Sequence, residues 1–426
     1  MNKNKYMKML TNFLKENVVT VFFAIMCVVA FLASGQKLSF LFSELSSRFF
    51  RNSLLVLSLI IPVLAGIGLN FGIVLGAMAA QAALIFVTYW QLQGLTAILV
   101  TVLICTPLSI IFGYLLGCLF NKTKGQEMIT GMICGYFANG IYQVFFLILC
   151  GSVIPMVSED LILITGVGIK DTVSLNDTVR NSLDRIWSVP MDKCFTVGCV
   201  LILLWCIYNV YQSNKNKSTN LTINMRSVYI KNGVVVALTA VLFILSKTNK
   251  QVKFALSFTD IPMIPLFITI LACLFMQFII RTKLGQNFRA IGNNMKVANA
   301  AGINVDKTRI MAIMISTVIA SWGQVLFLQN LGNFSTYSSH DNVGTFSVAA
   351  ILVGGASVRK ATVGQAILGI LLFHTLFIVS PMAGKNLFND AQYGEYFRTF
   401  VSYGVIAVAL VLHVISRSRE KKAAAE

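Results

Sequence analysis

The chain has 426 residues, of which 56% are hydrophobic and only 12% are charged, and its mean hydropathy is +0.76. Soluble domains carry roughly 25% charged residues, so this composition excludes a soluble globular protein. A bilayer core offers no water to satisfy backbone hydrogen bonds. We therefore expect an all-α polytopic membrane protein with most of the chain in one helical bundle.

The net charge is +18, which in a soluble protein would suggest a nucleic-acid partner. Here Lys and Arg gather at the ends of apolar segments, as the positive-inside rule expects, so we expect no nucleic acid and instead contact with anionic membrane lipid. The nine cysteines form no CxxC pair and lie mostly in apolar segments, where cysteine behaves as a small hydrophobe. We expect no disulfide, metal or cofactor.

Twelve apolar runs follow one another along the chain. They are Val18–Ala33, Leu54–Leu69, Phe71–Tyr89, Leu95–Phe120, Met128–Gly151, Cys194–Tyr211, Gly233–Ser246, Ile261–Ile280, Thr308–Asn330, Phe346–Ala356, Thr362–Ser380 and Thr399–Ile415. The first is long for a signal peptide, so we expect a retained helix. A full span needs about 20 mostly apolar residues; the short run Phe346–Ala356 therefore predicts a half-helix or a re-entrant segment.

Clusters of basic residues place both ends of the chain in the cytoplasm. We expect a cytoplasmic segment at 1–17, a membrane-spanning domain at 18–416 and a cytoplasmic tail at 417–426. The basic loop 282–307 is cytoplasmic, and the longer loop 153–193, with several acidic residues and expected partial order, is extracytoplasmic. Two cytoplasmic termini require an even number of spans. Twelve is one solution; about ten, which we favour, follows if two of the C-terminal runs are broken or re-entrant.

A glycine-rich stretch joins the second and third apolar runs, which only Asn70 separates. It reads PVLAGIGLNFGIVLGAMAAQ and carries four closely spaced glycines. One interpretation is tight helix packing, which glycine permits. The other is a broken helix, which is tolerated at membrane depth where it is buried in protein or lines a cavity and which often builds transporter sites.

Uncharged polar residues interrupt the apolar runs, and no Asp, Glu, Lys or Arg lies at the centre of any run. This absence argues against a proton-coupled or ion-coupled carrier. The polar candidates are Asn70, Gln81, Asn139, Gln143, Gln277, Gln324, Gln365 and His374. Amides suit neutral, hydroxyl-rich solutes because they offer donors and an acceptor; the alternative role is hydrogen bonding between helices.

The loop RAIGNNMKVANAAGINVDKT predicts a short helix across the ends of two spans. Its spacing puts Ala298 and Ala301 on one face, Gly302 ends the helix, and Asn304 or Asp306 caps the next one. Such a helix either docks into a groove on a partner or merely connects two spans.

The stretch GQNFRAIGNNMKVANAAGINVDKT resembles a motif of permease subunits in bacterial ABC importers for sugars, nucleosides and branched-chain amino acids. The matching positions are Gly285, Arg289, Ala290, Gly292, Asn294, Ala298, Ala301, Gly302, Ile303, Asn304 and Val305. A second stretch, SVAAILVGGASVRKATVGQAILG, resembles the family's glycine-rich segment ahead of the last helices. The resemblance implies a coupling helix that docks on an ATPase subunit, with these residues involved: Arg289, Gly292, Asn294, Ala298, Ala301, Gly302 and Ile303.

Two weaker matches are similar to nucleoside-type permeases. They run through Asn70 and Gly72, and through Glu127, Ile129 and Tyr136, with departures elsewhere in both segments. We accordingly expect a small polar solute: a nucleoside or related heterocycle first, a pentose-like sugar second and a branched-chain amino acid third. The residues that we assign to its path are Asn70, Gly72, Asn139, Gln143 and His374.

The family implies partners: cytoplasmic ABC ATPase subunits, a second copy or a homologous permease, and an extracytoplasmic substrate-binding protein, all at the bacterial inner membrane. The chain itself has no phosphate-binding GxxxxGK[ST] loop, so we expect ATP hydrolysis on a separate subunit and no catalytic residue here. A channel and a membrane enzyme are the alternatives. An intramembrane protease would need a motif such as GxSG with a histidine, which the segment around Ser357 does not fit.

Overall fold

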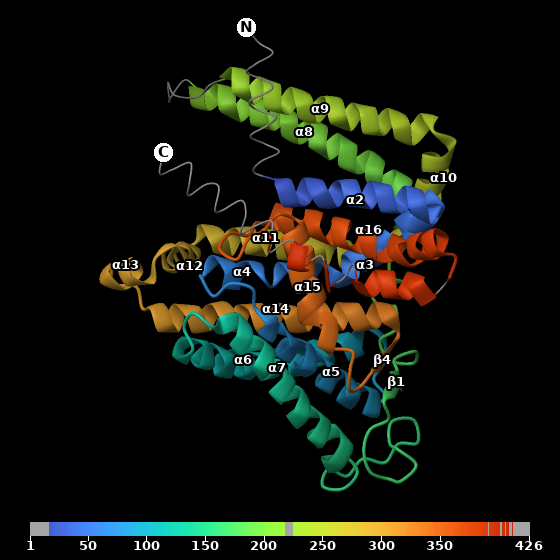
Figure 1. Cartoon of the computed structure of the whole chain (residues 1–426), viewed down its shortest axis with the longest axis vertical. Coiled ribbons are helices and arrows are strands. Elements are labelled where there is room, and N and C mark those ends of the chain that lie inside the picture. Colours follow the sequence, from blue (N-terminus) through green and yellow to red (C-terminus); the bar gives the residue numbers. More distant parts are fainter. Residues whose placement is uncertain are drawn as a thin grey trace.

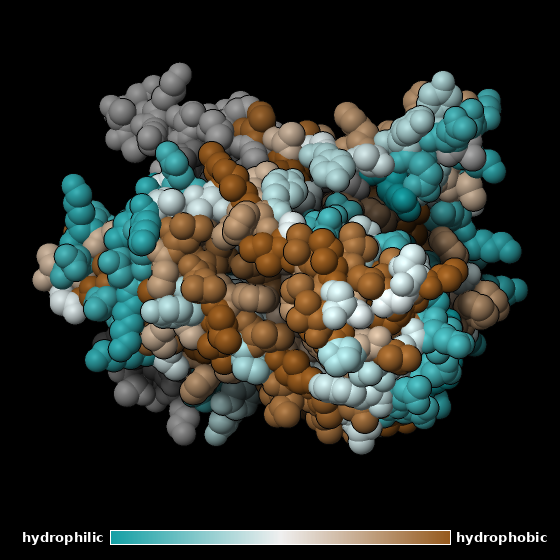
Figure 2. All heavy atoms as spheres, turned by 90° about the horizontal axis from the view of Figure 1, so that it is seen from below, coloured by the Kyte–Doolittle hydropathy of each residue, from teal (hydrophilic) through white to brown (hydrophobic). Residues whose placement is uncertain are grey.

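The structure is a computed structural model that describes residues 17–217, 225–390, 392–400, 403–404, 406–408 and 411. Within these residues, nine helices are long and apolar enough to cross a membrane, and two further apolar helices, Val18–Ser34 and Asp341–Val353, are shorter. The expectation of an all-α polytopic membrane protein with about ten spanning helices is confirmed. Figure 2 shows an apolar band between two hydrophilic ends.

In the described part of the chain the elements run from α2 to α16, and four three-residue strands form two antiparallel pairs, β1 with β4 and β2 with β3. The N-terminal half contains α2 (Val18–Ser34), α3 (Leu38–Leu57), α4 (Ile60–Leu64), η1 (Phe71–Ile73), α5 (Val74–Tyr89), α6 (Gly94–Lys122), α7 (Glu127–Val144), the π-helical turn η2 (Phe145–Leu149), β1 (Thr172–Ser174) and β2 (Ser188–Pro190). The C-terminal half contains α8 (Met191–Lys217), α9 (Met225–Thr248), α10 (Lys250–Phe258), β3 (Asp260–Pro262), α11 (Met263–Arg281), α12 (Lys283–Asn293), α13 (Met295–Ala300), α14 (Val305–Leu331), β4 (Asn333–Ser335), α15 (Asp341–Val353) and α16 (Val363–Phe388).

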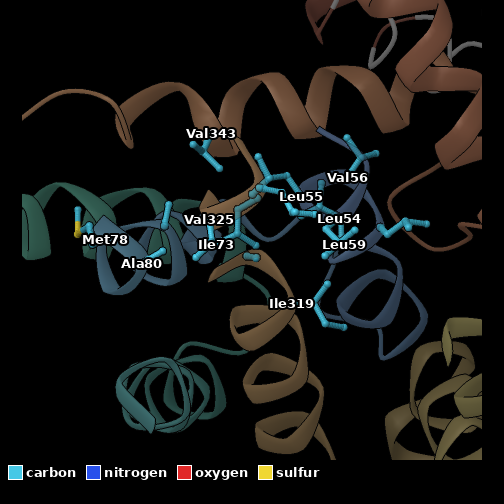
Figure 3. Packing of buried hydrophobic residues seen from close by; sticks show 14 of the residues in the cluster. Leu54, Leu55, Val56, Leu59, Ile73, Met78, Ala80, Ile319, Val325 and Val343 are labelled. Carbon is cyan, nitrogen blue, oxygen red and sulfur yellow. The ribbon is translucent and has the colours of Figure 1, made fainter. Parts of the chain in front are cut away.

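Helix α14 runs through the middle of the bundle, with α5 and α6 on one side and α3 on the other (Figure 1). Buried side chains of α3, η1, α5, α14 and α15 meet in one apolar core (Figure 3). The short helices α12 and α13 lie at one end of the bundle, here called the α13 end, and β1 and β4 lie at the opposite end, the β1–β4 end (Figure 1). The positions of the candidate sites are described relative to these two ends.

Helix α3 begins much earlier than the apolar pattern indicates. The sequence places the second run at Leu54, but the candidate span extends over Leu38–Leu64. Glu44, Arg48 and Arg51 break the apolar pattern in its first half, which is why it reads as a loop. The helix accommodates both guanidinium groups by placing each over a phenylalanine ring, 5.1 and 5.2 Å from the ring centroids, which is a favourable cation–π arrangement.

The chain leaves helical conformation between α4 and η1, so the broken-helix interpretation of the glycine-rich stretch is confirmed. Gly66 and Gly68 both adopt positive φ, at 72° and 86°. A Cβ atom on Gly66 would lie 2.8 Å from the Cα of Gly292 in α12, so the break also packs tightly, as the alternative interpretation expects. This close approach ties the break to the α13 end of the bundle.

Helix α15 has 13 residues and corresponds to the short run at Phe346–Ala356. A Cβ on Gly68, in the break after α4, would lie 3.1 Å from Val358, in the connection between α15 and α16. Arg359 and Lys360 of this connection line a pocket together with Gly292. The connection therefore lies at the α13 end, so α15 leads to that end and α16 leads away from it.

The long loop that includes residues 153–193 is ordered in the structure, through contacts with the last turn of α14 and with the segment that follows it. Strand β1 pairs with β4, and Asp184 accepts hydrogen bonds from Gln329 and Asn330 at 3.0 and 2.8 Å. The Tyr337 hydroxyl donates to the carbonyl of Ile169 at 2.7 Å. Burial raises the pKa of Tyr337 to about 12, so this donor stays protonated at physiological pH.

Helices α15 and α16 touch through glycine backbones, and this contact yields a matched pair of variants. A Cβ on Gly369 would collide with the carbonyl oxygen of Ala350, whereas one on Gly364 would meet nothing within 4 Å. We expect Gly369→Ala to destabilise the protein by about 1–3 kcal/mol through overpacking. Gly364→Ala should be neutral or slightly stabilising, because alanine favours helix. Thermal unfolding in detergent measures both; equal midpoints would contradict the close helix contact.

Candidate functional site

The predicted coupling loop forms two short helices, each capped by a side chain. Thr282 Oγ1 accepts from the backbone N–H of Gly285 at the start of α12. Asn294 Oδ1 accepts from the N–H groups of Lys296 and Val297 at 3.0 and 3.2 Å at the start of α13. Asn294 therefore has a structural role, because it satisfies orphan donors of the helix N-terminus.

The end of α13 agrees with the sequence prediction. Gly302 has φ +81°, and its N–H donates to the carbonyl of Asn299 at 3.0 Å while that of Ile303 donates to Ala298 at 3.1 Å. This pair of bonds is a Schellman motif, in which glycine takes the left-handed position. Asn304 then caps α14 by accepting from Lys307 N–H at 3.0 Å, which confirms the first of the two predicted caps.

One expectation about α13 is wrong: Ala298 and Ala301 do not lie on one face of a helix. Ala298 is 2% exposed and packs against Ile291 and Val305, whereas Ala301 is exposed. The reason is that the helix ends at Ala300, so Ala301 belongs to the turn that follows it. The outward surface, here called the α13 tip, consists of Lys296, Val297 and residues 299–302, which are all exposed.

Gly292 lies inside the protein interface between α12 and α4. A Cβ at this position would collide with the carbonyl oxygen of Leu64, so a glycine is required for the close approach to the chain break. Arg289 is exposed, and Ile303 is half-buried beside Ala298. Among the predicted coupling residues, the structure leaves two side chains fully available to a partner: those of Arg289 and Ala301.

A buried ion pair lies directly beneath the α13 tip and was not identified from the sequence. Arg309 of α14 is fully buried, and its Nη2 pairs with the carboxylate of Glu127, at the first position of α7. The same nitrogen lies 3.4 Å from the carbonyl of Phe120 in α6, and Nη1 lies 3.2 Å from the sulfur of Met295 in α13. One guanidinium thus joins four helices.

A second ion pair, between Lys124 and Asp306, lies three residues from the first on each side and is open to solvent. Lys124 Nζ lies 2.6 Å from Asp306 Oδ1, and their side chains are 44% and 60% exposed. Exposed pairs stabilise proteins by roughly 0–1 kcal/mol. This pair therefore serves as a natural comparison for the buried one.

Polar side chains gather in the second half of α7, where the sequence predicts two path residues. Asn139 Nδ2 donates to Asp341 Oδ1 at 3.0 Å, and Gln143 Nε2 donates to Asn139 Oδ1 at 3.3 Å. Asn139 lies close to the midpoint of the 23-residue candidate span Glu127–Leu149. The structure therefore brings Asn139 and Gln143 together and adds a carboxylate that the sequence did not indicate.

His340 precedes this carboxylate and is fully buried. Its Nδ1 lies 2.6 Å from Gln81 Oε1, its Nε2 lies 3.5 Å from Asp341 Oδ1, and its ring centroid is 5.2 Å from that of Tyr142. The sequence missed His340 and Asp341 because they belong to the polar stretch STYSSHDN, which reads as a loop. Nothing local shows that this loop folds back against the middle of α5 and α7.

The other predicted path residues lie away from this cluster and make local contacts. Asn70 is buried, accepts from Gly72 N–H at 2.9 Å and caps η1. Its Nδ2 lies 3.5 Å from Ser316 Oγ of α14. A Cβ on Gly72 would collide with the side chain of Leu116 in α6. His374 is buried on α16 beside Phe373, with ring centroids 5.3 Å apart. None of the three joins the Asn139 cluster.

A narrow cleft of about 50 Å³ lies beside Asp341, the carboxylate of the Asn139 cluster. It lies between η1, α7 and α15 and is lined by Phe71, Val74, Gly131, Met132, Gly135, Tyr136, Asp341, Gly344 and Thr345. Among the described residues no group of three or more His, Cys, Asp or Glu side chains is placed to hold a metal ion. The cleft can therefore offer hydrogen bonds and one negative charge to a solute.

The two ion pairs beneath α13 predict different stability effects. Glu127→Gln leaves the buried Arg309 without a counter-charge, and breaking a buried pair costs about 3–5 kcal/mol. Asp306→Asn removes the exposed pair and should cost less than about 1 kcal/mol. Thermal unfolding of both variants in detergent measures the difference; a Glu127→Gln protein as stable as Asp306→Asn would show that the buried pair is not formed.

Comparison with known proteins supports a transport role. Residues 42–410 match a family model described as "Branched-chain amino acid transport system / permease component". Similar proteins include the probable ABC transporter permease protein YphD of Escherichia coli, 25% identical over 168 residues, which are 39% of this chain and 48% of YphD. The xylose transport system permease protein XylH of Haemophilus influenzae is 27% identical over 165 residues (39% of this chain, 41% of XylH).

The nucleoside ABC transporter permease protein NupB of Lactococcus lactis is 28% identical over 156 residues (36% of this chain, 40% of NupB). The alignments span about half or less of the length of these relatives. No solved structure matches. Because the family model covers well over half of the residues, the chain belongs to the permease components of branched-chain amino acid-type ABC transport systems.

Proposed function

We propose that this chain is the membrane-spanning subunit of an ATP-driven importer and that the α13 tip docks on a cytoplasmic ATPase subunit. The observation that carries the proposal is the rigid, exposed helix at one end of the bundle: both of its ends are capped, and its most exposed apolar side chain, Val297, is 64% exposed. A short preformed helix docks into a partner's groove without a large ordering cost.

The charge distribution supports a cytoplasmic location for the α13 end. Arg281, Arg289, Arg359 and Lys360 line one pocket there, beside Gly292. Positive residues are concentrated in cytoplasmic loops of membrane proteins. We therefore place the α13 end in the cytoplasm, the β1–β4 end outside, and the whole chain in the bacterial inner membrane.

The buried ion pair suggests how docking is transmitted. Met295 of α13 touches Arg309, which pairs with Glu127 at the start of α7. A shift of the tip would therefore move α7, and α7 carries Asn139 near the midpoint of the candidate span Glu127–Leu149. ATP and the loaded binding protein would each favour a different position of these helices, which produces alternating access by population shift.

The remaining partners and the solute follow from the family. The chain would work beside a second permease copy or a homologue, and a substrate-binding protein would contact the β1–β4 end. The named relatives serve xylose and nucleosides. Amide and carboxylate groups at Asn139, Gln143 and Asp341 suit a solute rich in N–H and O–H donors. We propose a nucleoside or related heterocycle first, a pentose-like sugar second and a branched-chain amino acid third.

The first prediction concerns the partner. The tagged chain, extracted in mild detergent, should co-purify with a nucleotide-binding ATPase subunit. Mass spectrometry of the purified material identifies it. A chain that purifies alone, under conditions that keep other membrane complexes intact, would instead favour a channel or a membrane enzyme.

The second prediction concerns the α13 tip. Ala301→Glu adds a bulky charge to an exposed position that has no packing partner to disturb, so the chain should fold normally. Solute uptake per ATP hydrolysed should fall at least about tenfold, which corresponds to a loss of roughly 1.4 kcal/mol of docking energy. Uptake and ATPase activity are measured together in proteoliposomes.

Gln212→Glu, at an exposed position near the end of α8, provides the matched control with the same added charge away from the tip. Normal coupling in Ala301→Glu, or equal loss in both variants, would refute a docking role for the tip.

A further inference from the structure

We propose that Asp341 determines solute specificity: its carboxylate faces an aqueous passage along α7, where it accepts N–H or O–H donors of neutral or cationic solutes and repels anionic ones. The inference rests on the proposed import function, and it adds a specific residue and a charge preference that the family membership does not supply. It is carried by the depth of Asp341 in the membrane, its exposure, the orientation of its carboxylate and the cleft beside it.

Asp341 lies at membrane depth although it follows a loop. Its partner Asn139 is near the midpoint of the span Glu127–Leu149, and Gln81, which bonds the adjacent His340, is near the midpoint of the span Phe71–Tyr89. Two independent helices thus place the carboxylate far from both ends of the bundle. An ionisable group at this depth marks a functional site by default.

The carboxylate is nevertheless open at the surface of the chain. The Asp341 side chain is 43% exposed, and Gln143 is exposed beside it. Against hydrocarbon, a carboxylate at a helix centre costs about 2.5–3.5 kcal/mol on insertion scales. The carboxylate is therefore not held against lipid in the assembled transporter, and the proposed passage places water beside it.

Contacts on two sides orient the carboxylate. The buried His340 ring lies between Gln81 and Asp341: its Nδ1 is 2.6 Å from Gln81 Oε1, and its Nε2 is 3.5 Å from Asp341 Oδ1. With Asn139 donating from the other side, two helices orient one oxygen, and the second oxygen is left for a solute.

Small residues keep space beside that oxygen. The cleft of about 50 Å³ that Asp341 lines has Gly131 and Gly135 of α7 and Gly344 of α15 in its walls. A Cβ on Gly135 would meet nothing closer than 4.0 Å, whereas Cβ atoms on Gly131 and Gly344 would lie 3.2 and 3.1 Å from backbone atoms of Gly72 and Phe71. The cleft is therefore open on the Gly135 side, and glycines at the other two positions permit the close approach of η1. A favourable interaction of Asp341 with the N-terminal dipole of α15 accounts for an acidic residue there, but it does not account for Asn139, Gln143 and the open wall.

The test uses cysteine modification in open membrane fragments that contain the whole transporter. Thr345 lines the same cleft one helical turn from Asp341. A Thr345→Cys chain is treated with a cationic and with an anionic water-soluble methanethiosulfonate, and each rate is divided by the rate for free cysteine. The parent chain, which retains its native cysteines, supplies the background to be subtracted. Ser174→Cys in β1 is the positive control and shows that the reagents reach the protein. Leu274→Cys, at an exposed position of α11, is the negative control for a side chain that faces lipid.

We expect the cationic reagent to react about tenfold faster than the anionic one at Thr345→Cys, as a nearby fixed negative charge requires. The ratio should fall close to one in Thr345→Cys/Asp341→Asn, while Leu274→Cys stays unreactive. No reaction at Thr345→Cys, with normal reaction at Ser174→Cys, would overturn the aqueous passage; a ratio unchanged by Asp341→Asn would overturn the role of the carboxylate. The ratio of the two reaction rates can be measured whether or not an ATPase is bound. The expected ratio in a chain that does not co-purify with an ATPase would therefore support this inference and contradict the import function.

Discussion

The pairing of Arg309 with Glu127 is the interaction on which both candidate sites depend. Each charge is buried, and each would cost several kcal/mol if left alone away from water. The pair therefore fixes the start of α14 relative to the start of α7. The α13 tip lies just ahead of α14, and the Asn139 cluster lies farther along α7. A displacement of the tip can therefore be transmitted directly to the cluster, because the ion pair joins the start of α14 to the start of α7.

Backbone contacts between glycines form a second connection at the same end. Gly292 of α12 packs on Gly66 at the chain break, and Gly68 packs on Val358, between α15 and α16. The coupling segment thus contacts the break that leads into η1, and the break in turn contacts the connection that follows α15. Residues of η1 and α15 line the cleft at Asp341. Closely packed interfaces of this kind shift as units rather than deforming gradually. All three walls of the cleft, α7 included, are therefore attached to the segment that would meet the ATPase.

The local features of α13 were predictable from the sequence, and the long-range ones were not. Gly302 and Asn304 act within a few residues of their own positions, so their sequence pattern is sufficient. The start of α3 was missed because Glu44, Arg48 and Arg51 conceal an apolar face. Arg309 and Glu127 are 182 positions apart, and a single sequence contains no signal for such a pairing. Each residue alone resembles an ordinary charge near the end of a helix.

The position of Asp341 bears on whether an ion gradient could drive transport. The apolar runs contain no ionisable residue at their centres, which argues against an ion-driven carrier, yet the fold brings a carboxylate to mid-span from a loop. Among the described residues its nearest cationic candidate is the buried His340, at 3.5 Å, and the other contact is a neutral amide. A proton relay needs a chain of titratable groups across the membrane. Here a single carboxylate is held between amides and an imidazole at the wall of a cleft. This arrangement is suited to recognising a solute. The energy for transport would enter at the α13 end, where α7 begins and where the ATPase subunit is proposed to dock.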